Sequence, residues 1–121
     1  MKQKLAIVAA VAALGLAPLA HADAAKDAKV KGMMTEAGCF ACHAVDHKLV
    51  GPAYEWVAYR YKGDKGAVKK LAEKVLKGGA GNWNAYTGGI PMSPNPSLGM
   101  AKAEEMVEWV LEQKPVEPPK P

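Results

Sequence analysis

Five consecutive residues, Cys39-Phe40-Ala41-Cys42-His43, constrain this chain more than any other segment. Two cysteines separated by two residues suit a short helical turn, and such a turn spans the two vinyl groups of a haem. A histidine directly after Cys42 has little freedom except to point at the iron. The segment therefore predicts one covalently attached haem c, with Cys39 and Cys42 bound to the vinyl groups and His43 bound to the iron.

The same cysteine spacing also occurs in thioredoxin-like redox sites, and exported proteins use cysteine pairs as structural disulfides. A thioredoxin-like site requires a βαβ unit beside the cysteines, and the sequence contains no convincing strand pattern. A disulfide between Cys39 and Cys42 would close only a very small loop, so it would stabilise the chain little. We therefore favour haem attachment over both alternatives.

The first residues of the chain have the pattern of a secretory signal peptide. Two lysines precede the charge-free apolar run 5–17, and Ala20-His21-Ala22 has the small residues of a cleavage site. We expect residues 1–22 to be removed, the mature chain to begin at Asp23, and the protein to reach the periplasm.

Removal of the signal changes the charge balance. The full chain has 16 basic and 12 acidic residues, a net charge of +4, and two of the lysines lie in the signal, so the mature charge is +2. The remaining lysines are scattered among acidic residues, which disfavours a nucleic-acid partner. No later apolar run approaches the roughly 18 residues of a membrane-spanning helix, and no cysteine follows the cleavage site to carry a lipid. We expect a soluble monomer without membrane insertion.

Apolar residues recur at helical spacing in four stretches of the mature chain. The clearest stretch is 67–77, where one face is apolar and two glycines follow the last residue. The others span 26–37, the stretch from Gly51-Pro52 to Gly63, and 101–113, each followed by a glycine or a proline. The expected fold is all-α, with four or so short helices wrapped around one haem.

A long segment, 78–99, separates the last two predicted helices. Its many glycines and its three prolines predict an irregular loop, which compact domains usually retain only for a function. We expect this loop to wrap a flat haem. Four prolines in residues 115–121 predict a flexible, extended and frayed tail that follows a haem domain at residues 23–114.

The second axial ligand of the iron decides whether a haem protein carries electrons or binds small molecules. His47 is too near His43 in sequence to reach the opposite haem face, and it reads as an exposed loop residue. Met92 lies in the proline-rich stretch 89–96, whose fixed backbone dihedrals can hold one thioether toward a metal. Met100 is the second candidate, whereas three other methionines fall at core spacing: Met33, Met34 and Met106.

Several segments together resemble the small class I bacterial cytochromes c of the cytochrome c-551 (cytochrome c8) type. The resemblance covers most of the mature chain and implies the small class I cytochrome c fold. In that fold the first and last helices cross, which brings residues 32–34 against Trp109. The segments that carry the resemblance are 38–44, 49–54, 89–92 with Asn95, and 108–111.

The same resemblance implies which residues hold the haem. His43 and Met92 are the implied axial ligands, and the carbonyl oxygen of Pro52 accepts a hydrogen bond from the His43 ring. Asn95 is expected to form a hydrogen bond near the Met92 sulfur. Trp83 is expected to reach a haem propionate.

The chain departs from the family pattern in two places near Met92. Residues 84–91, which link Trp83 to Met92, form a longer connection than is usual in the family. Ser93 stands where a proline commonly follows the ligand methionine. Neither difference alters the four residues expected to hold haem and iron.

Iron with both axial positions filled by protein exchanges electrons rather than binding substrate. We therefore expect an electron carrier, not an enzyme, that meets respiratory or photosynthetic redox proteins at an exposed haem edge, through an interface of under about 1,200 Å². Lys48, Lys62 and Lys65 are candidates for steering an acidic partner, although scattered lysines more commonly face solvent. Two alternatives are an electron-entry subunit of a periplasmic redox enzyme and a ligand-binding haem sensor.

Overall fold

The computed structural model describes residues 19–121, with side chains described from Asp23 onward. Residues 1–18 of the predicted signal peptide therefore lie outside the described residues. Two single-turn 3₁₀ helices are η1 (Cys39–Ala41) and η2 (Pro96–Leu98), and the described chain has isolated bridges but no strand. The all-α prediction is confirmed by five α-helices: α1 (Leu19–Glu36), α2 (Tyr54–Arg60), α3 (Ala67–Lys77), α4 (Asn84–Thr87) and α5 (Met100–Leu111).

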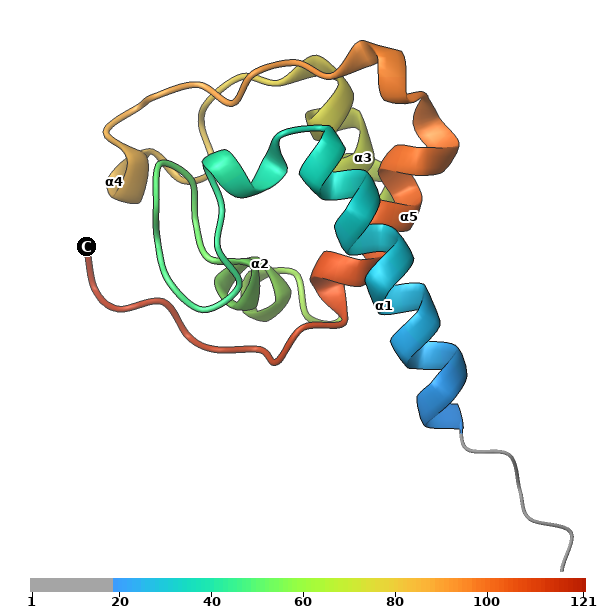
Figure 1. The fold of residues 1–121 in the computed structure, drawn as a ribbon. Helices are drawn as coiled ribbons and strands as arrows, with labels where there is room; N and C mark the ends of the chain where they lie inside the picture. The colour runs from blue at the N-terminus through green and yellow to red at the C-terminus, as the bar shows by residue number, and fades with distance from the viewer. Residues whose placement is uncertain (1–18) are drawn as a thin grey trace, which may run out of the picture.

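Helix α5 lies at the centre of the packing, because it contacts α1, α2 and α3. Its Met106, Trp109 and Val110 share one buried cluster with Val30 and Met34 of α1. The first and last helices therefore cross, as the family resemblance implies (Figure 1). In this view α1, α3 and α5 gather on one side of the molecule, and the segments 38–53 and 78–99 extend to the other.

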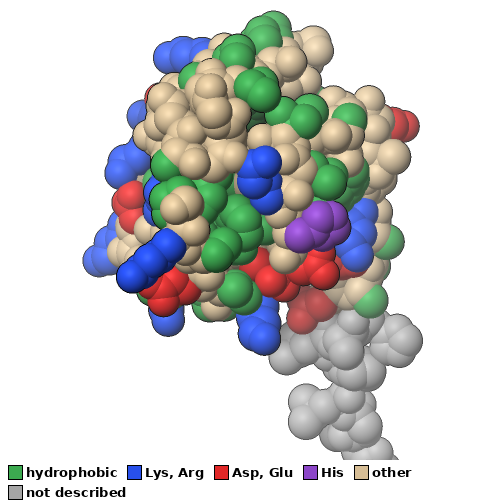
Figure 2. Space-filling view, turned by 90° about the vertical axis from the view of Figure 1, so that its left-hand side faces the viewer, with side chains coloured by type: hydrophobic (Ala, Val, Ile, Leu, Met, Phe, Trp, Pro, Cys, Tyr) green, Lys and Arg blue, Asp and Glu red, His purple; other side chains and the backbone are tan. Residues whose placement is uncertain are grey.

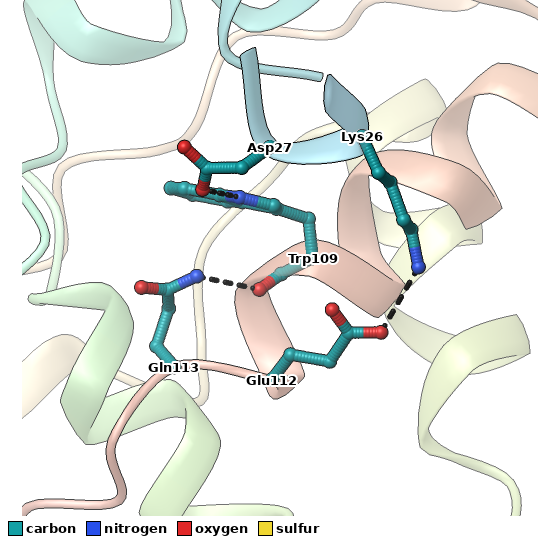
Figure 3. Close-up of polar contacts among 5 residues, drawn as sticks. All are labelled: Lys26, Asp27, Trp109, Glu112 and Gln113. Atoms are coloured by element: carbon teal, nitrogen blue, oxygen red, sulfur yellow. Dashed lines mark hydrogen bonds and ion pairs between the residues drawn. The ribbon is translucent and has the colours of Figure 1, made fainter. Parts of the chain in front are cut away.

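Polar contacts fix the crossing of α1 and α5 (Figure 3). Nε1–H of Trp109, whose side chain is 3% exposed, donates to Oδ1 of Asp27 at 2.7 Å. Just beyond α5, Oε1 of Glu112 lies 3.0 Å from Nζ of Lys26, and Nε2 of Gln113 donates to the carbonyl oxygen of Trp109 at 2.8 Å. A buried indole needs a partner for its one N–H, so Asp27 favours this orientation of the two helices.

Helix α3 spans the residues that the sequence predicts, Ala67–Lys77. Small side chains allow it to approach α5 closely, since Ala72 and Ala103 are both fully buried beside Val107. Gly78 ends the helix with φ 66° and ψ −156°, a conformation almost restricted to glycine. The chain therefore turns sharply out of α3 into the loop 78–99.

Other helix boundaries differ from the prediction by one to three residues, except that α1 begins at Leu19, seven residues before the predicted start at residue 26. Helix α2 begins at Tyr54 rather than at Gly51-Pro52, because Ala53 is still extended, with φ −58° and ψ 143°. The predicted irregular loop 78–99 contains α4 and η2, and a single turn is too short to show apolar periodicity. Within residues 19–121, no helix is both long enough and apolar enough to cross a membrane.

The last segment, residues 115–121, is extended, as its prolines predict. The sequence predicts a frayed end, whereas the structure attaches this segment at two points. N–H of Val116 donates to the carbonyl oxygen of Glu55 at 3.1 Å, and the carbonyl oxygen of Pro119 accepts from the Tyr86 hydroxyl at 2.7 Å. Figure 1 shows the segment passing α2 toward α4.

Candidate functional site

One cavity brings the predicted site residues together. It has a volume of about 400 Å³, and most of its lining is apolar. His47, an exposed loop residue, and Met100, which is 36% exposed, are not part of this lining. The cavity is lined by all seven residues predicted to attach the haem, bind its iron or contact these groups: Cys39, Cys42, His43, Pro52, Trp83, Met92 and Asn95.

The two cysteines lie at the turn η1, directly after α1. Gly38 enters this turn with φ 76°, and the N–H groups of Cys42 and His43 donate to the carbonyl oxygen of Cys39 at 3.2 and 3.0 Å. Neither cysteine forms a disulfide. Burial raises the pKa of the Cys39 thiol, while Cys42 is exposed. Both thiols are therefore available for thioether bonds.

Three neighbours hold the His43 ring in one orientation. Its Nδ1 lies 2.8 Å from the carbonyl oxygen of Pro52, and its face stacks on Tyr54 with ring centroids 4.9 Å apart and planes tilted by 16°. Gly51 is the third neighbour, because a Cβ atom there would lie 2.8 Å from Nδ1 of His43. A carbonyl oxygen accepts only from an N–H, so Nδ1 carries the proton and Nε2 keeps a free lone pair.

Electrostatics also favour a metal-binding form of His43. Burial lowers the pKa of the imidazole, and the hydrogen bond to Pro52 opposes this effect only in part. The ring is therefore neutral at pH 7, which is the form that binds a metal. The sequence alone does not reveal that Gly51 and Tyr54 contact the His43 ring, because only the folding of the loop brings them next to it.

Met92 is fixed by its backbone. Its N–H donates to the carbonyl oxygen of Gly79, and its own carbonyl oxygen accepts from the Gly79 N–H, both at 2.9 Å. This approach depends on Gly78, where a Cβ atom would lie 2.8 Å from the Pro94 nitrogen. The glycine pair after α3 thus makes room for the segment that carries Met92.

Asn95 is anchored beside Met92. Its backbone N–H lies 3.1 Å from the carbonyl oxygen of Val75 in α3, and its side-chain amide donates to the carbonyl oxygen of Ser93 at 3.1 Å. The amide is therefore engaged with the backbone of the Met92 segment. A hydrogen bond from Asn95 to the Met92 sulfur stays a prediction of the family resemblance.

Trp83 lines the cavity from the loop 78–99 and carries a cation on its ring. Cζ of Arg60 lies 3.7 Å from the ring centroid, and the same guanidinium donates to the carbonyl oxygen of Asn82. Such a stacked guanidinium contributes about 0.5–1 kcal/mol at an exposed site. Arg60 carries no sequence signal for this role, because the contact joins α2 to a distant loop.

Lys74 brings a positive charge to the cavity. It is the one lysine or arginine among the described residues of the lining, and its Nζ donates to the carbonyl oxygen of Ala80 at 3.2 Å. The helical pattern of α3 places Lys74 off the apolar face, so periodicity alone indicates a solvent-facing lysine. Only the loop that folds over the end of α3 shows that Lys74 borders the cavity.

Comparison with known proteins decides the family. The family model described as "Cytochrome c" matches residues 28–114. The chain belongs to the cytochrome c family. This cytochrome c is 48% identical over 77 residues to cytochrome c-551 of Azotobacter vinelandii, covering 64% of this chain and 88% of that protein. It is 39% identical over 102 residues to cytochrome c-551 of Allochromatium vinosum, covering 84% of this chain and 97% of that protein.

A solved structure supports the fold. The wild-type cytochrome c552 of Nitrosomonas europaea aligns with a TM-score of 0.62 and 35% identity, over 69% of this chain and 98% of that chain. The fold is therefore that of a class I cytochrome c. Membership of the family implies covalently bound haem c, and one Cys-x-x-Cys-His segment accommodates one haem. This cytochrome c is thus related to single-haem electron carriers that work with redox protein partners.

Proposed function

We propose that this cytochrome c is a periplasmic carrier of single electrons whose iron is bound by His43 and Met92. The observation that carries the proposal is the convergence of these two side chains with Cys39 and Cys42 on one apolar cavity. Haem c attached there supplies reversible exchange of one electron between ferric and ferrous iron. If His43 and Met92 both bind the iron, they would leave no coordination position for a substrate, which favours a carrier over an enzyme.

The residues around the cavity fit a haem. The volume of about 400 Å³ lies within the range of small-molecule sites, about 300–1,000 Å³. His43 presents a neutral Nε2, and Met92 presents a soft thioether. Apolar walls that include Met34 and Val110 would shield a bound haem from water. A thioether ligand in apolar surroundings favours the reduced state and so raises the reduction potential.

The polar groups of the lining suit the carboxylates of the two haem propionates. Lys74 offers a positive charge, and Trp83 offers an indole N–H. Arg60 adds a second positive charge next to Trp83. Asn95, which lines the cavity with Met92, would provide an amide donor on the Met92 side of the site.

Redox partners are proposed to bind where apolar side chains reach the surface beside the cavity. Val50 and Ile90 line the cavity and are 42% and 57% exposed, and Leu49 is 40% exposed. Figure 2, which views the molecule from the side of α4, shows apolar side chains interspersed with separate basic and acidic ones. A small mixed surface suits the brief encounters of a monomeric carrier, with interfaces below about 1,200 Å².

Replacement of Met92 tests the ligand assignment. Met92→Ala should abolish the charge-transfer absorption of methionine-ligated ferric haem and allow the reduced protein to bind carbon monoxide. Met100→Ala is the matched control, because Met100 is 36% exposed and lies outside the cavity lining, and it should leave both properties unchanged. Persistence of the absorption in Met92→Ala would refute the assignment.

Separate experiments address attachment, export and the carrier role. The double variant Cys39→Ala/Cys42→Ala should lose haem under denaturing conditions, and the protein from a periplasmic fraction should begin at Asp23. Carbon monoxide binding by the unaltered reduced protein at neutral pH would favour a ligand-binding sensor. Co-elution with a larger redox enzyme on gel filtration would favour an electron-entry subunit.

A further inference from the structure

Tyr86 joins the loop that leads to Met92 to two distant parts of the chain. It lies in α4, the turn formed by the long link 84–91. Its ring packs on Trp83 and on Trp56 of α2, with centroids 5.7 and 5.5 Å apart. Its hydroxyl donates to the carbonyl oxygen of Pro119 at 2.7 Å. One side chain therefore contacts the loop, α2 and the final segment of the sequence.

The final segment, residues 115–121, forms a strap across α2 and α4. Besides its contact with Tyr86, it is attached to α2, because N–H of Val116 donates to the carbonyl oxygen of Glu55 at 3.1 Å. Val116 and Pro118 are half-buried. The strap contains four prolines, which restrict the detached segment to extended conformations and so reduce the entropy lost when it attaches.

The link 84–91 has few other restraints. Its own backbone hydrogen bonds are local, such as that from Gly88 N–H to the carbonyl oxygen of Asn84 at 2.9 Å. Gly88 and Gly89 adopt φ values of 65° and 81°, and glycines pass readily between such conformations and others. Ile90 is 57% exposed. The contacts of Tyr86 therefore supply much of the restraint at this end of the link.

We propose that Tyr86 and the strap hold the link 84–91 against the cavity and so slow the release of Met92 from iron. The inference rests on the proposed function, because it takes Met92 as the axial ligand. Thr87, Ile90 and Met92 line the cavity and follow Tyr86 in the chain. Outward movement of the link opens the cavity to outside ligands, and Tyr86 acts as a positioning residue that opposes this movement.

The rate at which imidazole displaces the sixth ligand in the ferric holoprotein tests the inference. Tyr86→Phe keeps the ring and removes only the hydroxyl, and it should raise this rate about two- to tenfold, the factor expected for one net hydrogen bond. A chain that ends at Lys114 lacks the strap and should react at least as fast as Tyr86→Phe. Tyr59→Phe makes the same chemical change at a 41% exposed tyrosine of α2 outside the strap contacts, and it should leave the rate unchanged.

Combining the two changes shows whether they act through one contact. In the chain that ends at Lys114, Tyr86→Phe should have no further effect on the rate, because its partner Pro119 is already absent. Multiplication of the two effects, an unchanged rate in Tyr86→Phe, or an equal acceleration by Tyr59→Phe would each overturn the proposal.

Hydrogen exchange separates failure of the strap from failure of the ligand assignment. The amides of Gly88 and Ile90 should exchange about two- to tenfold faster in Tyr86→Phe and in the shortened chain, whichever side chain binds the iron. Unchanged exchange would overturn the strap even where Met92→Ala establishes Met92 as the ligand. Faster exchange together with an unaltered spectrum of Met92→Ala would support the restraint of the link by the strap and would reject Met92 as the iron ligand.

Discussion

Gly51→Ala tests whether the orientation of His43 depends on the absence of a side chain at position 51. An added Cβ would lie 2.8 Å from Nδ1 and 2.9 Å from Nε2 of His43. Gly51 is not among the glycines with positive φ, so alanine suits its backbone and the cost is steric. The ring has little room to retreat, because Nδ1 is bonded to Pro52 and the ring face stacks on Tyr54.

The expected cost follows from this crowding. An extra methyl group in a well-packed region destabilises a protein by about 1–3 kcal/mol. For a domain of this size, 1 kcal/mol corresponds to about 4–8 °C, so the melting temperature of the holoprotein should fall by about 4–24 °C. Thermal unfolding followed by circular dichroism measures this change, and the absorption spectrum reports any altered contact between His43 and iron.

Gly32→Ala is the matched control. No atom lies within 4 Å of an added Cβ at Gly32, which is in α1. Alanine is favoured over glycine inside a helix by about 0.5–1 kcal/mol, so this variant should melt at a higher temperature than the unaltered protein. If the free energy of unfolding of Gly51→Ala is within about 0.5 kcal/mol of that of the unaltered protein, the effect is no larger than that of a typical surface substitution. The steric reasoning would then be refuted.

Three further variants test the turn at the end of α3 and the crossing of α1 and α5. Gly78→Ala should lower the free energy of unfolding by about 2–4 kcal/mol, because Gly78 has φ 66° and ψ −156° and an added Cβ would lie 2.8 Å from the Pro94 nitrogen. An unchanged free energy of unfolding, measured with denaturant, would contradict this prediction. Trp109→Phe should lower the free energy of unfolding by about 2 kcal/mol at pH 7, because it removes the indole donor and leaves a cavity. Asp27→Asn keeps an acceptor oxygen, so it should destabilise the protein less. The reverse order would count against the contact between Trp109 and Asp27. The hydrogen bond from Trp109, and after it that from Lys31, lowers the pKa of Asp27 below 3.8. The unfolded chain therefore binds a proton at Asp27 more readily than the folded chain does. The stabilisation by the carboxylate is present above about pH 4 and is lost as the pH falls further. The melting temperature of Asp27→Asn should therefore depend less on pH below about 4 than that of the unaltered protein, and an identical dependence would refute this role of the carboxylate.

Helix prediction succeeded where apolar periodicity is strong and caps are clear. Helix α3 occupies the predicted residues, because its apolar face repeats over several turns and Gly78 ends it sharply. Helix α4 is a single turn and shows no repeat, so periodicity does not reveal it. The four prolines of residues 115–121 predict extension, but they contain no information on the attachment to Tyr86.

The sequence by itself determined the local chemistry of this protein. The spacing of Cys39, Cys42 and His43 indicates haem attachment because all three lie within one short turn. The proline-rich stretch 89–96, together with the family resemblance, favours Met92 as the second ligand. Only the tertiary structure decided which groups hold these residues: Gly51 and Tyr54 around the His43 ring, Gly79 against Met92, and the strap against Tyr86. The physical reason is that local spacing fixes contacts within a turn, whereas contacts between distant segments depend on how the helices and loops pack.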